Sequence, residues 1–431
     1  MKSNHSGESI GILWAQYGPY HFTRAAALQK LAAPAKVHAL ELANQTSDYR
    51  WNRSTEGVKL ITLCAGAITE KLSFWKVFWR ARKTFEELKL EVCFLPSYAP
   101  KQSLAALFAA KSLGIRIVMM NDSHAGTARA GWLGMGIKRR LVGMFDAALV
   151  AGVPQKRYFV SLGLQQEKIF TGYDAVDNDY FAARADEIRS RKSEVKNQYD
   201  LPEHYFLSVG RFVVKKNLTT LLQAYRKFLD SNQSCQMHLV MIGSGEEGPK
   251  LHSLCQELRL PTYDKTSAGT EDRKSKIKDE PPGVHFYGFR QIEENPVFYA
   301  LADAFILPSL WEEWGLVVNE AMASGLPVIV SETAGCAEDL LEPSGPMESL
   351  PLQTLTQLAQ MGLLAKARIN GFVVNPKSSD ELGRAMLILD GSLGLRCVMG
   401  HASRRIVEKF SCGNFARNAL RAAQAAQATT R

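Results

Sequence analysis

The 431-residue sequence lacks the features that mark membrane-spanning and disulfide-rich proteins. No uninterrupted apolar run approaches the ~20 residues that a membrane-spanning helix requires. The first residues, MKSNHSGES, contain no apolar core, so we expect no signal peptide. The seven cysteines are scattered and form no CxxC pair, a pattern that fits reduced thiols rather than disulfides or a zinc site. These absences predict a cytoplasmic protein.

The sequence also lacks a basic, aromatic motif of any known nucleic-acid-binding fold, although its net charge is +9. We therefore expect no nucleic-acid partner, and an anionic membrane surface is the better candidate for this charge. A hydrophobic content of 46% and a charged content of 22% are ordinary for a globular protein. A chain of this length is too long for one hydrophobic core and suits two α/β domains.

A helix predicted over residues 72–88, LSFWKVFWRARKTFEEL, is the source of the membrane hypothesis. Five aromatic residues alternate with cations in it, and no acidic residue occurs between 71 and 83. Such a helix is able to lie in a membrane interface, which would make the protein peripheral on the inner face of a membrane. The alternative is a helix that packs on the core and exposes a solvated basic face. The basic run at 137–140 is more typical of a solvated helix face.

Residues 305–331 predict a buried strand, a polar loop, a helix and a second buried strand. Strand, helix and strand in so few residues form a βαβ unit of a parallel sheet. Such sheets bind ligands in the crevice beyond the carboxyl ends of the strands. The polar loop residues Glu312, Glu313 and Gly315 are therefore expected where a ligand would lie.

The residue types around this loop suit a sugar nucleotide. The helix that begins near Leu316 presents backbone N–H groups and a positive dipole end, which favour a phosphate. Glu312 and Glu320, with seven residues between them, are able to accept hydrogen bonds from sugar and ribose hydroxyls. The alternative is that Glu320 is only a first-turn glutamate favoured by the helix dipole.

The same stretch resembles glycosyltransferase family 4, retaining group 1 glycosyltransferases with the GT-B fold. The family pattern PS-x-x-E-G-F-G-L-x-x-x-E-A-M-A-x-G-x-P-V is matched at 308–309, 312, 314–316, 320–323, 325 and 327–328, with Trp314 in place of Phe. A match of this length is far more specific than a short motif. One departure is Glu313, where the family usually has glycine, and this departure leaves the preferred sugar open.

A second block, YFLSVGRFVVKKNLTTLLQAYRKF at 205–228, resembles the family's strand, V-G-R turn and helix. The resemblance implies that Gly210, Arg211 and Lys216 bind the donor diphosphate. An arginine and a lysine that converge on a leaving diphosphate stabilise its developing charge. The alternative is a solvated basic turn that caps the start of the helix.

The resemblance implies further site residues in the amino-terminal half. The loop AQYGPYHF is glycine-rich in the family, whereas here only Gly18 remains, so the loop either contacts the donor or shapes the acceptor site. In the family a histidine after the strand at 115–121 lies near the reacting sugar. The candidates here are Asp122 and His124, and His124 is alternatively a cap of the segment that follows.

Other motifs carry weaker implications. We expect a strand at 284–290, and in the family the exit loop of this strand lies against the nucleobase, which makes Phe289 and Arg290 candidate base contacts. The GxGxxG at 243–248 lacks an acidic residue at the distance a dinucleotide site needs, so we expect no NAD. Asp177–Asp179 spells Asp-x-Asp, but the resemblance implies a structural turn and no bound metal. Two insertions are expected, at 261–283 and 343–368.

The resemblance implies a GT-B fold, two Rossmann-like parallel-sheet domains facing an interdomain cleft. Residues 1–182 would bind the acceptor, with a helix at 413–431 packed back on them, and residues 200–412 would bind the donor. Glu320 would bind the ribose hydroxyls, Glu312 the donor sugar, and the amides of Gly315, Leu316 and Val317 the diphosphate.

The implied reaction is retaining transfer from a UDP- or GDP-linked sugar to a glycan or lipid-linked acceptor, in cell-surface polysaccharide or glycolipid biosynthesis, without a cofactor. Alternatives are a GT-B phosphorylase, a nucleotide-sugar epimerase and a non-catalytic nucleotide-sugar-binding protein.

Overall fold

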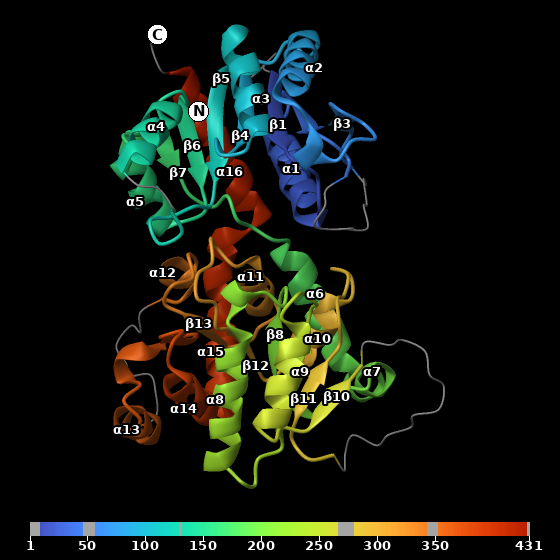
Figure 1. Ribbon diagram of the computed structural model, residues 1–431, viewed down its shortest axis with the longest axis vertical. Helices are drawn as coiled ribbons and strands as arrows, with labels where there is room; N and C mark the ends of the chain where they lie inside the picture. Colours follow the sequence, from blue (N-terminus) through green and yellow to red (C-terminus); the bar gives the residue numbers. More distant parts are fainter. Residues whose placement is uncertain (1–8, 46–56, 129–131, 266–279, 343–351, 429–431) are drawn as a thin grey trace. The chain divides into compact units, whose positions relative to one another are not determined.

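The structure, a computed structural model, forms two compact units (Figure 1). Unit 1 comprises the chain up to Asp177 together with the residues from Lys409, and unit 2 comprises Asn178–Glu408. The residues described are 9–45, 57–128, 132–265, 280–342 and 352–428. Within these ranges no helix is both long enough and apolar enough to cross a bilayer.

Unit 1 contains a seven-stranded parallel sheet in the order β3-β2-β1-β4-β5-β6-β7. Its strands are β1 (Ser9–Trp14), β2 (Lys36–Glu41), β3 (Leu60–Thr62), β4 (Val92–Pro96), β5 (Arg116–Asn121), β6 (Ala147–Val150) and β7 (Ile169–Phe170). The central strands are apolar runs because both of their faces are covered: every residue of β1 is buried.

Helices cover both faces of this sheet, as Figure 1 shows. They are α1 (Pro19–Ala32), α2 (Phe74–Glu87), α3 (Lys101–Ser112), α4 (Trp132–Val142), α5 (Val153–Ser161) and α16 (Cys412–Gln427). Alternate side chains of β1 pack on opposite faces of the sheet. Ile10 and Ile12 belong to the core under α1 and α16, whereas Leu13 belongs to the core under α2 and α3. Helix α16 packs directly against α1 although the two are distant in sequence.

Unit 2 contains an eight-stranded sheet in the order β10-β11-β9-β8-β12-β13-β15-β14, parallel except for β14. Its strands are β8 (His204–Val209), β9 (Met237–Ile242), β10 (Thr262–Asp264), β11 (Val284–Phe286), β12 (Ala304–Leu307), β13 (Val328–Ser331), β14 (Ala367–Arg368) and β15 (Gly371–Val374). The prediction of two α/β parallel-sheet domains is therefore confirmed.

Ten α-helices are described in unit 2, within the ranges given above. They are α6 (Asn178–Ser190), α7 (Lys192–Tyr199), α8 (Leu218–Ser231), α9 (Gly248–Glu257), α10 (Asn295–Leu301), α11 (Leu316–Ala323), α12 (Ala337–Leu340), α13 (Leu352–Gln360), α14 (Ser379–Asp390) and α15 (Leu393–Val407). Ile306 of β12 packs into the core under α8 and α14, while its neighbour Phe305 meets Tyr299 of α10 on the other face. Most of the insertion expected at 261–283, and the start of the one at 343–368, lie outside the described residues.

Candidate functional site

Two loops of unit 2 meet at the carboxyl ends of β8 and β12, which are adjacent in the sheet. The amide of Leu310, after β12, donates to the carbonyl of Lys215, after β8, at 2.8 Å. The side chain of Asn217 donates to the carbonyls of Pro308 at 3.0 Å and of Pro376 at 2.7 Å. These bonds fix the loop after β8 against the loop after β12.

Glycine permits the close approach of backbone at this end of the sheet. Gly243, after β9, has φ +139°, and a Cβ there would lie 1.9 Å from the carbonyl oxygen of Gly210. Gly210 has φ +155°, and its own Cβ position lies 3.4 Å from Cε of Lys216. The turn therefore brings the backbone of Gly210 directly beside the Lys216 side chain.

Two lysines of the first loop pair with two glutamates of the second. Lys215 Nζ lies 3.2 Å from Glu312 Oε1 and 2.8 Å from Glu313 Oε2. Lys216 Nζ is hydrogen-bonded to Glu312 Oε2, which also accepts from Ser309 Oγ at 3.3 Å. This set, here called the lysine–glutamate cluster, joins residues about a hundred positions apart in sequence.

The electrostatics of the cluster keep Glu312 ionised. Burial by itself raises the pKa of Glu312, but the ammonium groups of Lys216 and Lys215 outweigh it and lower the pKa below its ordinary value. Burial lowers the pKa of Lys215, but Glu312 and Glu313 more than offset that effect and raise it. Glu312 and Lys215 are therefore both charged at neutral pH.

A small hollow lies beside the cluster. Its lining includes Gly210, Arg211 and Lys216 from the first loop, and Leu307 and Pro308 from the second. Arg211 and Lys216 thus both line one hollow at the end of β8, and two cationic residues close together favour an anion nearby.

Helix α11 begins beyond the cluster, after Gly315, which has φ +110°. Leu316 and Val317 form the first turn, so their amides lie at the positive end of the helix. Glu320 is fully buried one turn further on. The buried Trp314 donates from Nε1 to Asn319 Oδ1 at 2.9 Å and so fixes the loop onto the helix.

The loop after β11 adjoins the same end of the sheet, since the amide of Gly243 donates to the carbonyl of Gly288 at 2.8 Å. Phe289, next in this loop, is 45% exposed. Arg290 lies 3.5 Å from Glu294 and donates to the carbonyl of Lys265 at 3.5 Å. The structure thus places Phe289 at the surface and binds Arg290 to neighbouring segments of its own unit.

The remaining sequence candidates lie in unit 1. The Gly18 amide donates to Nδ1 of His21 at 2.9 Å, so this N–H is used within the loop. His124 is buried, and its Nδ1 accepts from the amide of Gly126 at 3.2 Å within the same loop. Asp122 follows β5 directly and lies close enough to Asp174 to influence its pKa.

Asp174 forms a second buried charged pair, with Arg24 of α1. Arg24 Nη2 lies 3.4 Å from Asp174 Oδ1, and Arg24 Nε donates to the carbonyl of Ala175 at 2.8 Å. Burial raises the pKa of Asp174 to about 7, because Arg24 lowers it less than burial and Asp122 raise it. Sequence reasoning missed this pair, since no local motif links α1 with the loop after β7.

Lys215 is the other residue that sequence reasoning missed as a site residue. Its signal was present as the adjacent lysines at 215–216, but only the pairing of β8 with β12 shows that both reach Glu312. In the described part of the chain, no group of three or more His, Cys, Asp or Glu residues is arranged to hold a metal ion.

Comparison with known proteins identifies relatives that are glycosyltransferases. Residues 203–389 match the model of the family described as glycosyl transferases group 1. An uncharacterized glycosyltransferase of Methanocaldococcus jannaschii is 26% identical over 253 residues, 58% of this chain and 52% of the relative. The O-antigen chain mannosyltransferase B of Escherichia coli is 28% identical over 145 residues, 33% of each chain. The chain thus spans about half or less of these relatives.

Solved structures match the whole chain at low identity. A glycosyltransferase from Rickettsia africae superimposes with a TM-score of 0.68 at 14% identity, covering 98% of this chain and 99% of that one. HepE of Anabaena, in complex with UDP and glucose, gives a TM-score of 0.64 at 16% identity, covering 96% and 98%. This likeness establishes the fold. The chain therefore has the GT-B fold, and residues 203–389 of its unit 2 match the group 1 glycosyltransferase family.

Proposed function

We propose that the protein transfers a sugar from a nucleotide-diphosphate-sugar to the hydroxyl of an acceptor, with retention at the anomeric carbon. The observation that carries this proposal is the position of Lys216, which shares a hollow with Arg211 and also contacts the carboxylate of Glu312. One cationic side chain thus lies between an anion-binding hollow and a hydroxyl-binding acid. A diphosphate joined to a sugar has both groups in that order.

The cations would act on the leaving group. As the bond between the anomeric carbon and the diphosphate oxygen breaks, negative charge collects on the diphosphate, and Arg211 and Lys216 would stabilise it. The amides of Gly315, Leu316 and Val317, at the start of α11, would add to this stabilisation. The acceptor oxygen would bond to the anomeric carbon on the same face, and its proton would pass to a phosphate oxygen of the leaving group.

The lysine–glutamate cluster would keep Glu312 charged during this step. A diphosphate in the hollow competes with Glu312 for the ammonium of Lys216. Lys215 lies 3.2 Å from Glu312 and would remain to neutralise it, since Glu313 holds Lys215 at 2.8 Å. Glu312 would then accept hydrogen bonds from the donor sugar, and the buried Glu320 from the ribose.

The proposals for the nucleotide and the acceptor rest on similar proteins rather than on the geometry of the site. A solved structure with the same fold, HepE, has UDP and glucose bound, which favours a uridine over a guanosine donor here. A relative named as an O-antigen chain mannosyltransferase supports a glycan or lipid-linked acceptor in cell-surface polysaccharide synthesis. We propose that the protein works at the inner face of a membrane, where lipid-linked acceptors are found. Gly18 stays a candidate for a donor contact or for shaping the acceptor site, and Asp122 and His124 stay candidates for groups near the reacting sugar.

The test is the release of nucleoside diphosphate from a panel of UDP- and GDP-sugars. Lys216→Ala should lower kcat by ~10²–10³, because one charge-stabilising group is lost. Lys227→Ala is the matched control, since Lys227 is an exposed lysine of α8 that pairs with Asp380 at 2.7 Å. An unchanged rate for Lys216→Ala would falsify the assignment. Interconversion of donor sugars without release of diphosphate would indicate an epimerase instead.

A further inference from the structure

One face of helix α2 packs against the hydrophobic core of unit 1. Val77, Ala81 and Phe85 are completely buried and belong to the core beneath α2 and α3. Ser73 caps the start of the helix by accepting from the amide of Lys76 at 3.3 Å. This inner face of α2 is therefore that of a helix packed on the core, which was the alternative to a membrane-binding helix.

The opposite face combines large apolar rings with cations. Trp75 is 66% exposed and Trp79 is 62% exposed, one turn apart on α2. The two tryptophans line a shallow surface hollow together with Lys76, Arg80 and Lys83. These five residues are here called the tryptophan–cation face. Exposed tryptophans are costly in water, so two of them on one helix face indicate a surface that another phase or molecule covers.

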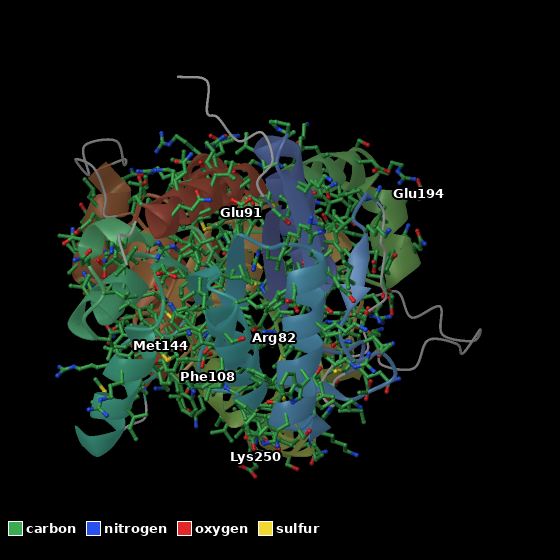
Figure 2. All side chains as sticks on the ribbon, turned by 90° about the horizontal axis from the view of Figure 1, so that it is seen from above. Arg82, Glu91, Phe108, Met144, Glu194 and Lys250 are labelled. Atoms are coloured by element: carbon green, nitrogen blue, oxygen red, sulfur yellow. The ribbon has the colours of Figure 1, made fainter. Side chains whose placement is uncertain are left out.

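The apolar part of this face extends onto the next helix. The ring of Phe78 lies edge-on to Trp75 at 5.9 Å and to Trp79 at 5.0 Å. Phe74 then meets Phe108 of α3, itself 41% exposed, at 6.2 Å. Figure 2 labels Phe108 on α3 and shows this helix beside α2, which carries Arg82. The rings form one continuous patch across two helices.

Charge on α2 is segregated along the helix. From its start to Lys83 every charged residue of α2 is a cation. The two acids, Glu86 and Glu87, lie in the last turn, where they pair with Arg82 and Lys83 at 3.7 Å. The tryptophan–cation face therefore carries a positive charge over the part that bears the exposed rings.

We infer that the tryptophan–cation face docks on the surface of an anionic lipid bilayer. Tryptophan rings favour the interface between headgroups and acyl chains, and Lys and Arg side chains there reach the lipid phosphates. Each Lys or Arg near such a surface adds attraction, which falls off within a Debye length. A single-stranded nucleic acid needs separate ring faces for base stacking, whereas these rings pack edge-on against one another.

The inference rests on the membrane location proposed above and names the surface that makes the contact. Binding to vesicles is measured without a sugar donor, so a failure here is distinguishable from a failure of sugar transfer, which is assayed without vesicles. The full-length chain is sedimented with vesicles of phosphatidylcholine, with and without phosphatidylglycerol, and tryptophan emission is recorded.

The expected result is binding to vesicles that contain phosphatidylglycerol, with a blue shift of tryptophan emission. Lys76→Gln with Arg80→Gln should weaken binding about 25-fold, at roughly fivefold for each cation. Trp75→Ser with Trp79→Ser should weaken binding by at least as much and abolish the blue shift. Added salt should weaken binding of the unaltered protein.

The matched control removes two other exposed cations and one exposed apolar residue of unit 1: Lys30→Gln, Lys36→Gln and Leu31→Ser. This control should bind as the unaltered protein does. Equal losses in the control and in the α2 variants would overturn the inference, as would equal binding to phosphatidylcholine alone. Competition by inorganic phosphate or by single-stranded RNA, at concentrations that match the lipid phosphate, would also overturn it.

Discussion

In each unit a loop that follows a strand carries a buried carboxylate beside at least one basic side chain, Glu312 in unit 2 and Asp174 in unit 1, and the pKa values of these two carboxylates shift in opposite directions. In unit 2 burial raises the pKa of Glu312, but two lysines outweigh it and lower the pKa. In unit 1 burial raises the pKa of Asp174 to about 7. The single arginine beside Asp174 lowers the pKa too little to offset burial, and the nearby Asp122 raises it further.

This difference teaches that burial alone does not decide the ionisation of a carboxylate; the number and sign of its charged neighbours do. Glu312 has two ammonium groups within 3.2 Å, and it remains charged beside a hollow suited to an anion. Asp174 has one guanidinium at 3.4 Å and titrates near neutrality. Both units are built on a sheet of mainly parallel strands, so the opposite pKa shifts arise from the loops and not from the sheets.

The largest effect is expected when Asp174 loses the guanidinium of Arg24, which lies 3.4 Å from it. At pH about 8, above the pKa of Asp174, Arg24→Met should destabilise unit 1 by roughly 3–5 kcal/mol, because a buried carboxylate is left without its partner. Hydrogen exchange of amides in β1 and α16, compared with amides of unit 2, measures the change in each unit.

A thermodynamic cycle controls this experiment. Arg24→Met combined with Asp174→Asn should be less destabilised than Arg24→Met alone, since the uncompensated charge is gone. If the two substitutions add, the pair is not the source of the effect.

The two units should also respond to pH with opposite sign. The folded-state pKa of Asp174 is raised, so its contribution to stability is fully present below its ordinary pKa and is lost as the pH rises to about 7. The pKa of Glu312 is lowered, so its contribution is present above the ordinary value and is lost as the pH falls through the folded-state pKa.

Between pH about 7 and about 5, unit 1 should therefore gain stability, equivalent to several degrees in its melting temperature. Further acidification should weaken unit 2. Hydrogen exchange resolved by unit measures both trends, and Asp174→Asn should remove the first one only. A gain in unit 1 that persists in Asp174→Asn would assign the effect to another group.

A smaller effect is expected in the lysine–glutamate cluster. Lys215→Met should lower kcat/KM about tenfold, because one charge-assisted hydrogen bond to Glu312 is lost. It should also move the acidic limb of the pH profile to higher pH, because the remaining lysine lowers the pKa of Glu312 less. Glu313→Gln should lower kcat/KM less, because it removes only the carboxylate that holds Lys215 at 2.8 Å. A uniform loss at all pH values would indicate a purely structural role for Lys215.

Much of the fold follows from local patterns. The run at 305–331 predicted a strand, a helix and a strand, and the structure has β12, α11 and β13 there. Helix α2 was expected at 72–88 and occupies Phe74–Glu87. Apolar periodicity and the stop signals after a helix suffice to predict such strands and helices, because these elements are determined by residues close together in the sequence. The roles of Arg211, Lys216 and Glu320 in binding the donor stay predictions.

The residue order determined which segments become strands and helices, and where glycines allow loops to pass close to one another. Only the tertiary structure decided that Lys215 meets Glu312, 97 positions away, and that Arg24 meets Asp174, 150 positions away. The reason is physical: charge pairing and pKa depend on distances through space and on burial. Both are set when adjacent strands such as β8 and β12 bring distant loops together.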